Sequence, residues 1–224
     1  MSRRLVIAID GPSGAGKSTA GRALARKLGY IFLDTGAMYR ALALKALRAG
    51  LPLDAEPELA ELARRTRIEL AGDGDLVTLD GEDVSGAIRT REVSAAASRV
   101  STHPAVRRLM VARQQELGRP GGVVLDGRDV GTVVFPDADL KFYLDANARR
   151  RAERRHAELA AAGVASDVDA IEREIRARDH ADSTRSDSPL TRAPDAIYLD
   201  STVLGAEEVV RRMAAAVQEK LFTA

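Results

Sequence analysis

A run of eight residues near the start of the chain has the composition of a phosphate-binding loop. The pattern G-x-x-x-x-G-K-[ST] is matched at each fixed position by Gly11-Pro12-Ser13-Gly14-Ala15-Gly16-Lys17-Ser18. Glycines let successive backbone N–H groups face phosphate oxygens, and the start of a following helix adds positive charge. Lys17 supplies a mobile cation for the β and γ phosphates, and the Ser18 hydroxyl can ligate Mg²⁺. The run therefore predicts a nucleoside triphosphate site, with a chance glycine turn as the alternative.

Arginines stand beside small or acidic residues in three later segments. These are Asp34-Thr35-Gly36-Ala37-Met38-Tyr39-Arg40, Asp126-Gly127-Arg128-Asp129-Val130-Gly131-Thr132 and Arg178-Asp179-His180-Ala181-Asp182-Ser183-Thr184-Arg185. The first two follow predicted strands, and an open α/β sheet binds its ligands at the carboxyl ends of its strands. We therefore expect Arg40 and Arg128 near the phosphate loop, where a forked guanidinium suits an anionic acceptor.

Each of these residues has a plainer interpretation when it is taken alone. A lone arginine on a helix, such as Arg40 or Arg107, is commonly a solvated charge. Arg178 and Asp182 are four residues apart, so they could form a surface ion pair worth about 0.3 kcal/mol. Thr35 could be only a helix cap. Their joint occurrence is what favours a ligand site.

The chain around the phosphate loop alternates between strand and helix patterns. An apolar run at residues 5–9 predicts a strand buried on both faces, and helix formers continue from Lys17 to Leu28 and stop at Gly29. Further strands are predicted at residues 30–33, 123–125, 140–144 and 196–199, and helices at 37–49, 105–117, 148–162 and 168–181. A closing helix places Val210, Met213, Val217 and Leu221 on one apolar face. This alternation is typical of an α/β fold with a parallel sheet.

Residues 51–100 do not continue this regular alternation of strand and helix patterns. Pro52 and Pro57 bracket a turn, and residues 58–65 predict a short helix. Strand-like pieces follow within residues 68–84, separated by the hairpin-turn signals Gly72-Asp73-Gly74-Asp75 and Asp80-Gly81. This segment predicts an inserted, partly antiparallel subdomain.

The composition of the 224 residues limits the classes of function. Hydrophobic residues make up 45% and charged residues 30%, as in ordinary globular proteins, and a net charge of +1 gives no overall field for nucleic acid or membrane. Absence of cysteine excludes disulfides and thiol chemistry, and His103, His156 and His180 lack metal-ligand spacing. The amino-terminal apolar run is too short for a signal peptide or a membrane span, so we expect a cytoplasmic protein.

Several segments, taken in order, resemble bacterial cytidylate kinases, within the P-loop nucleoside monophosphate kinases. They are residues 34–40, Gly-Glu-Asp-Val-Ser (81–85), Ile-Arg-Thr (88–90), Asp-Gly-Arg-Asp-Val-Gly-Thr-Val-Val-Phe-Pro-Asp-Ala (126–138) and Leu-Asp-Ser-Thr (199–202). The 126–138 run is specific to that family, whereas other nucleoside monophosphate kinases share only the phosphate loop.

The resemblance implies a P-loop NTPase three-layer α/β fold. This fold has a central parallel sheet with helices on both faces, an inserted acceptor-binding subdomain and a short helical lid. The corresponding division is a core of residues 1–35, 101–147 and 170–224, an insert of residues 36–100 and a lid of residues 148–169.

The implied activity is transfer of the γ-phosphoryl group of ATP, with Mg²⁺, to CMP or dCMP. The implied ATP site comprises Gly11, Pro12, Ser13, Gly14, Ala15, Gly16, Lys17, Ser18, Thr19, Arg151, Arg154 and Arg155, with Ser18 as the magnesium ligand. In the family pattern Thr35, Arg40 and Arg128 hold the acceptor phosphate, and Ser98, Arg107 and Asp129 read the cytosine edge. Tyr39, Arg178 and Asp182 surround the sugar, with Arg185 near the phosphates; Lys17, Arg128 and Arg185 are the expected catalytic residues. We expect a monomer without a nucleic-acid or membrane partner. Two departures from the family pattern, Thr35 where serine also occurs and less charged residues around Asp182, leave the preference between CMP and dCMP open.

The densest charge run is Arg149-Arg150-Arg151 with Arg154 and Arg155. It could be a solvated helix face, a nucleic-acid patch or a mobile lid whose arginines close over the triphosphate. Spacings of three and four place Arg151, Arg154 and Arg155 on one face. The lid is the interpretation that we favour.

Two rival functions are considered. One is a kinase of another nucleoside monophosphate or of a phosphate-free metabolite, and the other is a nucleotide-dependent switch. A GTPase would need the guanine-reading motif Asn-Lys-x-Asp, but the only asparagine, Asn147, is followed by Ala148. A phosphate monoester has a second pKa of about 6 and is mostly a dianion at neutral pH, so a kinase acting on one needs no strong general base.

Overall fold

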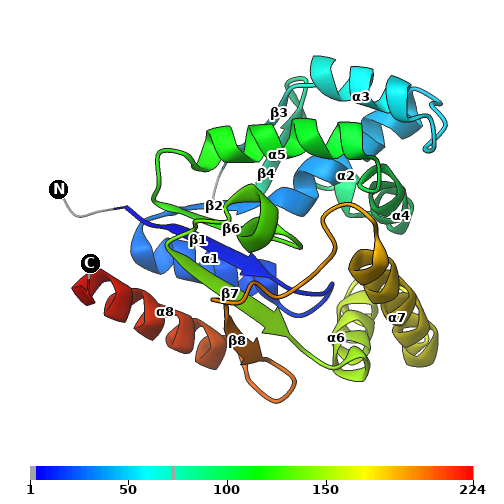
Figure 1. Cartoon of the computed structure of the whole chain (residues 1–224). Helices are drawn as coiled ribbons and strands as arrows, with labels where there is room; N and C mark the ends of the chain where they lie inside the picture. The colour runs from blue at the N-terminus through cyan, green and yellow to red at the C-terminus, as the bar shows by residue number, and fades with distance from the viewer. Residues whose placement is uncertain (1–3, 72–73, 224) are drawn as a thin grey trace.

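The computed structural model describes residues 4–71 and 74–223, and a parallel sheet of five strands lies at its centre (Figure 1). The strands are β1 (Val6–Asp10), β2 (Ile31–Asp34), β6 (Val123–Gly127), β7 (Leu140–Asp145) and β8 (Ile197–Asp200), in the order β2-β6-β1-β7-β8. The strand register aligns the carboxyl ends of the central strands. Asp10 lies opposite Gly127, and Asp34 lies opposite Asp126. The predicted phosphate loop and the Arg128 segment therefore leave the sheet at the same edge.

Helices cover both faces of this sheet, as the sequence predicts. On one face α1 (Lys17–Leu28) and α8 (Ala206–Thr223) pack on the side chains of Ile7 and Ile9. On the other face η2 (Val130–Val134), a short π-helical turn, packs on Ala8, and α5 (Pro104–Gly118) lies next to it. β1 is apolar on both sides because it is buried on both sides, which explains its unbroken apolar run.

Glycine residues fix both ends of α1. Gly16 precedes the helix with a positive φ of 92°, and Gly29 ends it with a φ of 64°. The Gly29 N–H reaches back to the carbonyl oxygens of Ala25 and Arg26, which closes the last turn. The predicted helix bounds and the predicted stop at Gly29 are confirmed.

The inserted region has its own small core. It contains α2 (Thr35–Arg48), α3 (Glu56–Arg65) and an antiparallel sheet of β3 (Ile68–Ala71), β4 (Leu76–Leu79) and β5 (Glu82–Asp83). The predicted turn at Asp80-Gly81 is present, with positive φ values of 51° and 91°. The other predicted turn includes residues 72–73, which lie outside the described residues.

Two helical elements of the insert were not predicted from the sequence. They are η1 (Ala87–Arg89) and α4 (Arg91–Val100). The Thr90 hydroxyl caps α4 by accepting the Val93 N–H at 3.2 Å, and small apolar side chains of α4 face the insert core. Val106 and Met110 of α5 belong to the same core, so α5 packs with the insert although its residues lie in the predicted core segment.

The charged helices α6 (Ala148–Ala161) and α7 (Val168–Thr184) pack against each other beyond the carboxyl end of β7 (Figure 1). Gly163, with a φ of 71°, lies in the turn between them. α7 extends to Thr184, three residues further than predicted, and so carries Arg178 and Asp182 on one continuous helix. No helix in residues 4–71 and 74–223 has the length and apolar character needed to cross a membrane.

Candidate active site

The phosphate loop connects β1 to α1 and depends on glycine at its first position. Gly11 has a φ of 145°, and a Cβ atom there would overlap the carbonyl oxygen of Leu144 on β7. No residue with a side chain therefore fits where β1 leaves the sheet. Gly14 and Gly16 also have positive φ values, of 77° and 92°, so the loop curls before α1 begins.

Protein donors hold three carbonyl oxygens of this loop. Lys17 Nζ donates to the Pro12 carbonyl at 2.7 Å, and Ser201 Oγ donates to the Ala15 carbonyl at 2.9 Å. Arg151 Nη1 donates to the Ser13 carbonyl at 2.9 Å. The loop is thus braced from α6 and from the segment after β8, and a braced loop can present its N–H groups to phosphate in a fixed geometry.

The charged groups at the base of the loop are buried and close together. Burial, with Arg128 nearby, lowers the pKa of Lys17 to about 7, against the opposing effects of Asp126 and Asp10. Burial also raises the pKa of Asp126 to about 7, with the carboxylate of Asp34 adding to the rise. An anionic phosphate next to Lys17 favours the protonated amine, so the site becomes more stable when nucleotide is bound.

Asp126 was not assigned a role from the sequence, although its position is informative. Its Oδ2 atom accepts a hydrogen bond from Ser18 Oγ at 2.6 Å. A hydroxyl and a buried carboxylate at the end of a phosphate loop are oxygen ligands of the kind that Mg²⁺ takes. The sequence signal was a strand ending in Asp-Gly, but only the sheet order places that strand next to β1.

The residues predicted to read the acceptor base form a buried ionic cluster. Arg107 on α5 is 3% exposed and pairs with Asp129, which follows β6. Arg185 at the end of α7 approaches the other oxygen of Asp129, at 3.7 Å. Burial raises the pKa of Asp129, and the three arginines Arg107, Arg185 and Arg128 oppose this rise. The cluster is positively charged overall and therefore suits an anionic ligand.

Buried guanidinium atoms in this cluster lack hydrogen-bond partners. Among the described residues these atoms include Nε of Arg107, Nε of Arg178 and Nη2 of Arg185. Burial, with Arg128 nearby, lowers the pKa of Arg178 to about 10. Buried polar atoms are normally paired, so the unpaired Nε atoms of Arg107 and Arg178 indicate a place for acceptor oxygens of a ligand.

The plainer interpretations of two predicted residues are wrong. The cap of α2 is Asp34, whose carboxylate accepts the Ala37 N–H at 2.8 Å, so Thr35 is not the cap. Thr35 Oγ1 instead donates to the Asp126 carbonyl at 2.7 Å. Asp182 pairs with Arg128 at 2.9 Å, which ties α7 to the segment after β6 rather than forming a local surface pair.

The remaining predicted acceptor residues lie on α2 and α4. Arg40 pairs with Asp34 at 2.8 Å, and the Arg107 guanidinium lies 5.9 Å from the centroid of the Tyr39 ring. Burial raises the pKa of Tyr39 to about 12, so its hydroxyl is protonated at neutral pH. Ser98 is half-buried on α4, and its hydroxyl donates to the Ser94 carbonyl at 3.3 Å.

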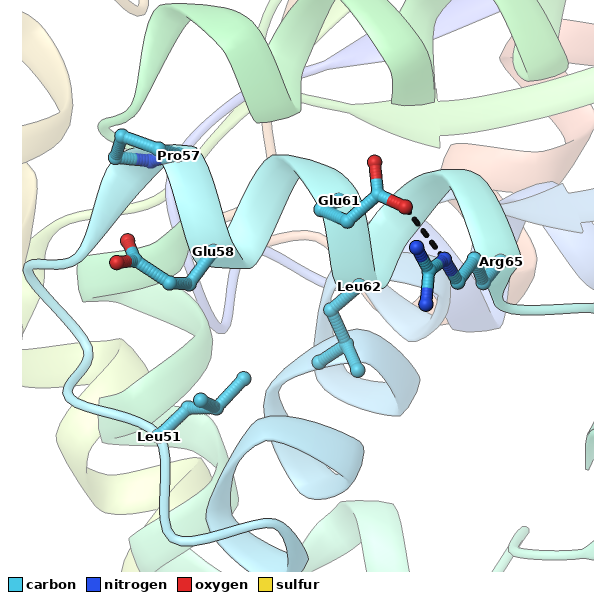
Figure 2. Close-up of a pocket in the computed structure, with 6 residues that line it drawn as sticks. All are labelled: Leu51, Pro57, Glu58, Glu61, Leu62 and Arg65. Carbon is cyan, nitrogen blue, oxygen red and sulfur yellow. Dashed lines mark ion pairs between the residues drawn. The ribbon is translucent and has the colours of Figure 1, made fainter.

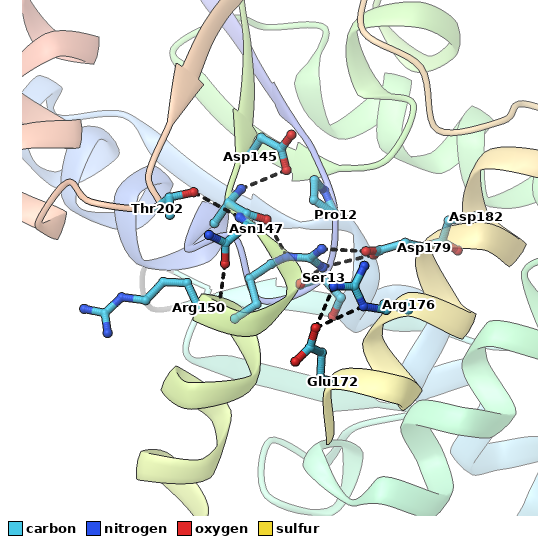
Figure 3. A network of polar contacts seen from close by, with 12 residues as sticks. Pro12, Ser13, Asp145, Asn147, Arg150, Glu172, Arg176, Asp179, Asp182 and Thr202 are labelled. Atoms are coloured by element: carbon cyan, nitrogen blue, oxygen red, sulfur yellow. Dashed lines mark hydrogen bonds and ion pairs between the residues drawn. The ribbon is translucent and has the colours of Figure 1, made fainter. Parts of the chain in front are cut away.

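The three predicted lid arginines have different surroundings. Arg151 is 4% exposed; it donates to the Ala146 carbonyl at 2.7 Å and pairs with both oxygens of Asp179 on α7, at 3.0 and 2.5 Å. Figure 3 shows Ser13 of the loop beside Asp179 and the start of α6. Arg154 binds the Ser201 carbonyl at 2.5 Å, and Arg155 is exposed. The three arginines are spaced to share one face of α6, but their side chains have different surroundings.

A surface pocket on the insert lies apart from these residues (Figure 2). It is lined by Leu51, Pro57, Glu58, Glu61, Leu62 and Arg65. Glu61 pairs with Arg65 at 2.5 Å, and none of the predicted site residues lines the pocket. It therefore does not belong to the site described here.

A parallel sheet with a phosphate loop after its central strand, and an arginine cluster at the same edge, define a P-loop kinase. Solved structures support this fold: shikimate kinase from Acinetobacter baumannii, in complex with shikimate, aligns with a TM-score of 0.50 at 17% identity, over 97% of this chain and 95% of that one. Shikimate kinase from Bacteroides thetaiotaomicron also gives 0.50, at 15% identity over 96% and 99%.

Sequence comparison identifies the family. The family profile described as cytidylate kinase matches residues 7–219. The cytidylate kinase of Syntrophotalea carbinolica is 51% identical over 98% of this chain and 94% of its own length, and that of Geobacillus sp. is 49% identical over 99% and 100%. The chain belongs to the cytidylate kinase family and is a phosphotransferase.

Proposed function

We propose that the protein transfers the γ-phosphoryl group of ATP to CMP and dCMP, giving ADP and CDP or dCDP. The observation that carries this proposal is the buried arginine cluster around Asp129, at the sheet edge where the phosphate loop begins. Arg128 links the two halves, because it pairs with Asp182 and also affects the pKa of Lys17. A site for the phosphoryl donor and a positively charged site for an anionic acceptor would thus face the same space.

In the acceptor half, Arg128, Arg40 and Arg185 would hold the phosphate of the nucleotide. The Asp129 carboxylate would accept a hydrogen bond from the exocyclic amine of cytosine, while Arg107 would donate a hydrogen bond to an acceptor atom of the ring. Uracil carries a carbonyl where cytosine has the amine, so it would face Asp129 with a second acceptor. The buried position of Asp129 makes such a mismatch costly, which supports discrimination at this atom.

Transfer needs positioning and charge stabilisation rather than a general base. The acceptor phosphate is mostly a dianion near neutral pH and is itself the nucleophile. Lys17, Arg128 and Arg185 would stabilise the negative charge that is spread over the transferred group. Rigid placement of the two nucleotides in line supplies the remaining acceleration.

We propose that Ser18 and Asp126 hold the magnesium ion that accompanies ATP. Their hydrogen-bonded oxygens and the burial of the carboxylate fit a divalent cation, which would remove the penalty of an isolated buried charge. The bound ion would supply positive charge that offsets the negative charge of the ATP phosphates.

Replacing Asp126 by asparagine tests this assignment. We expect the Mg²⁺ concentration for half-maximal activity to rise about 10- to 100-fold, because an oxygen ligand loses its charge. The KM for CMP should stay within about twofold. Initial rates measured against Mg²⁺ at saturating nucleotides give the answer, and an unchanged Mg²⁺ requirement would remove Asp126 from the metal site.

We also propose that the insert, residues 36–100, and a lid, residues 148–169, close over the two nucleotides and exclude water. Arg154 and Arg155 would approach the triphosphate during closure, and Arg151 would keep α6 joined to the phosphate loop. Exclusion of water prevents hydrolysis of ATP. We propose that the enzyme acts as a monomer in the cytoplasm, where its nucleotide substrates are available.

One assay tests the function directly. ADP release is measured with CMP, dCMP, UMP, AMP, GMP or no acceptor. We expect fast release with CMP and dCMP and at least about 100-fold lower kcat/KM with the others, because the pocket presents charged groups to the cytosine edge. A nucleotide-dependent switch would release ADP at the same slow rate with every addition, and a different preferred acceptor would refute the cytosine assignment.

A further inference from the structure

Asp10 is a buried carboxylate that the proposed chemistry does not use. It is the last residue of β1, immediately before the phosphate loop, and is 4% exposed. Each of its oxygens accepts a backbone N–H from η2: Val130 N–H donates to Oδ1 at 2.8 Å and Gly131 N–H donates to Oδ2 at 2.7 Å. Asp10 therefore ties the strand that carries the donor loop to the turn that follows Arg128 and Asp129.

The residues around the contact between Asp10 and η2 are closely packed. Asp10 lies opposite Gly127 in β6 and opposite Tyr143 in β7. A Cβ atom added at Gly131 would lie 3.3 Å from Asp10 Oδ2 and 3.1 Å from Cδ of Lys141. Packing of this kind leaves η2 little freedom to shift relative to β1.

Burial of the Asp10 carboxylate lowers the stability of the folded protein. Burial raises its pKa to about 6, Asp129 adds to the rise, and Lys17 and the two backbone hydrogen bonds oppose it. The other charged or titratable groups nearby are Tyr143, whose pKa Asp10 helps to raise, and Lys141, which packs against Gly131. Burial of an ionised carboxylate costs folding free energy that its hydrogen bonds only partly offset, which points to a role other than stability.

We propose that Asp10 is a positioning residue that sets the acceptor-binding pair, Arg128 and Asp129, in register with the phosphate loop. This inference rests on the proposed function. In-line transfer requires the donor and acceptor phosphates to be placed within a fraction of an ångström, and misplacement by about 1 Å can cost about 100-fold in rate. β1 is hydrogen-bonded to β6 and β7 on its two sides, and the paired hydrogen bonds of Asp10 extend this framework to η2.

The test compares Asp10→Asn with Asp139→Asn, a change in a carboxylate that lies just before β7 and binds the other end of β1. Asparagine has nearly the same size as aspartate. Its NH₂ group, however, would face one of the two backbone N–H donors and cannot accept a hydrogen bond from it. We expect kcat/KM for CMP to fall about 100-fold while the Kd for ATP stays within about twofold. In the control, Asp139→Asn, the replaced carboxylate accepts the Val6 N–H at 2.8 Å, and both parameters should stay within about twofold.

A second variant changes the η2 side of the contact between Asp10 and η2. Gly131→Ala places its Cβ against Asp10 and Lys141 and should displace η2 by a few tenths of an ångström. It should show the same selective loss for CMP, to a smaller extent. Equal losses for CMP and ATP, or no loss in either variant, would overturn the positioning role.

Thermal unfolding of the apoprotein provides a readout without substrate. Because the pKa of Asp10 in the folded protein, about 6, lies above the ordinary pKa of 3.8, the carboxyl contributes stability below pH 3.8 that is lost as pH rises through 6. The Tm of Asp10→Asn relative to wild type should therefore rise between pH 5 and pH 8. A difference that is constant or falls with pH would contradict the burial cost on which the proposal relies. If the wild-type enzyme prefers another acceptor, the proposed function fails, and the same comparison with that acceptor still decides the role of Asp10.

Discussion

Replacing Lys17 by methionine is expected to abolish phosphoryl transfer, with kcat lowered about 1,000-fold, in a protein that remains folded. Lys17 is the cation at the base of the phosphate loop, and its amine already contacts the loop through the Pro12 carbonyl. Loss of one well-placed group that stabilises transition-state charge typically costs about 100- to 1,000-fold. The measurement is single-turnover transfer from ATP to CMP.

The stability of this variant should distinguish a catalytic loss from a folding defect. The pKa of Lys17 in the folded protein, about 7, lies below the ordinary lysine pKa of 10.5. The apoprotein therefore loses stability as pH falls from 10.5 towards 7, because charging the buried amine is unfavourable. Methionine removes that loss, so the Tm of the variant at pH 7 should equal or exceed that of wild type.

Lys45→Met is a suitable control for Lys17→Met. Lys45 lies on α2 and pairs with Asp80 at 2.5 Å on the surface of the insert. Its replacement should leave kcat within about twofold, because a surface ion pair contributes little. Near-normal transfer by the Lys17 variant would refute the assignment of the loop as the donor site.

Replacing Asp129 by alanine should raise the KM for CMP about 100-fold and leave the KM for ATP within about threefold. Asp129 is the only carboxylate that we assign to the cytosine edge, and a site built to hydrogen-bond one group loses much of its affinity when that partner is removed. The same loss is expected with dCMP, because the base and not the sugar is affected. Steady-state kinetics with each nucleotide varied in turn measure the difference.

The same substitution should also lower stability, so the comparison between nucleotides is essential. Removal of Asp129 leaves the buried guanidinium of Arg107 without its partner, and breaking a buried pair commonly costs about 3–5 kcal/mol. Asp169→Ala, which removes an exposed carboxylate paired with Arg149 on the surface of α7, should change neither stability nor KM measurably. Equal increases in KM for CMP and ATP would point to general damage and contradict the proposed role.

The parts of the site that the sequence determined are those whose physical cause lies within a few residues. Gly11 takes a positive φ where the chain turns out of β1, and Gly29 ends α1 by its own conformation. The unbroken apolar run of β1 already indicates burial on both faces. Such signals are local, so the loop, α1 and most strands could be predicted from them.

Prediction failed or stayed open where the cause lies far along the chain. The helix α4 was missed because its small residues follow a segment full of turn signals, and its stability comes from packing in the insert core. Thr35 and Asp34 are both good caps in sequence, and only the folded chain selects Asp34. Regular spacing placed three arginines on one face of α6, whereas the neighbours of each side chain differ.

The partners of the charged groups were decided by the tertiary structure alone. Arg107 meets Asp129 because α5 packs against η2, which directly follows Asp129, and Asp182 meets Arg128 because α7 runs past the end of the sheet. Asp10 receives its two N–H donors from residues 120 and 121 positions away. A sequence lists such charges but does not pair them, since pairing follows from which buried elements pack together. The sequence by itself determined the chemistry of the phosphate loop, and the sheet order determined what faces it.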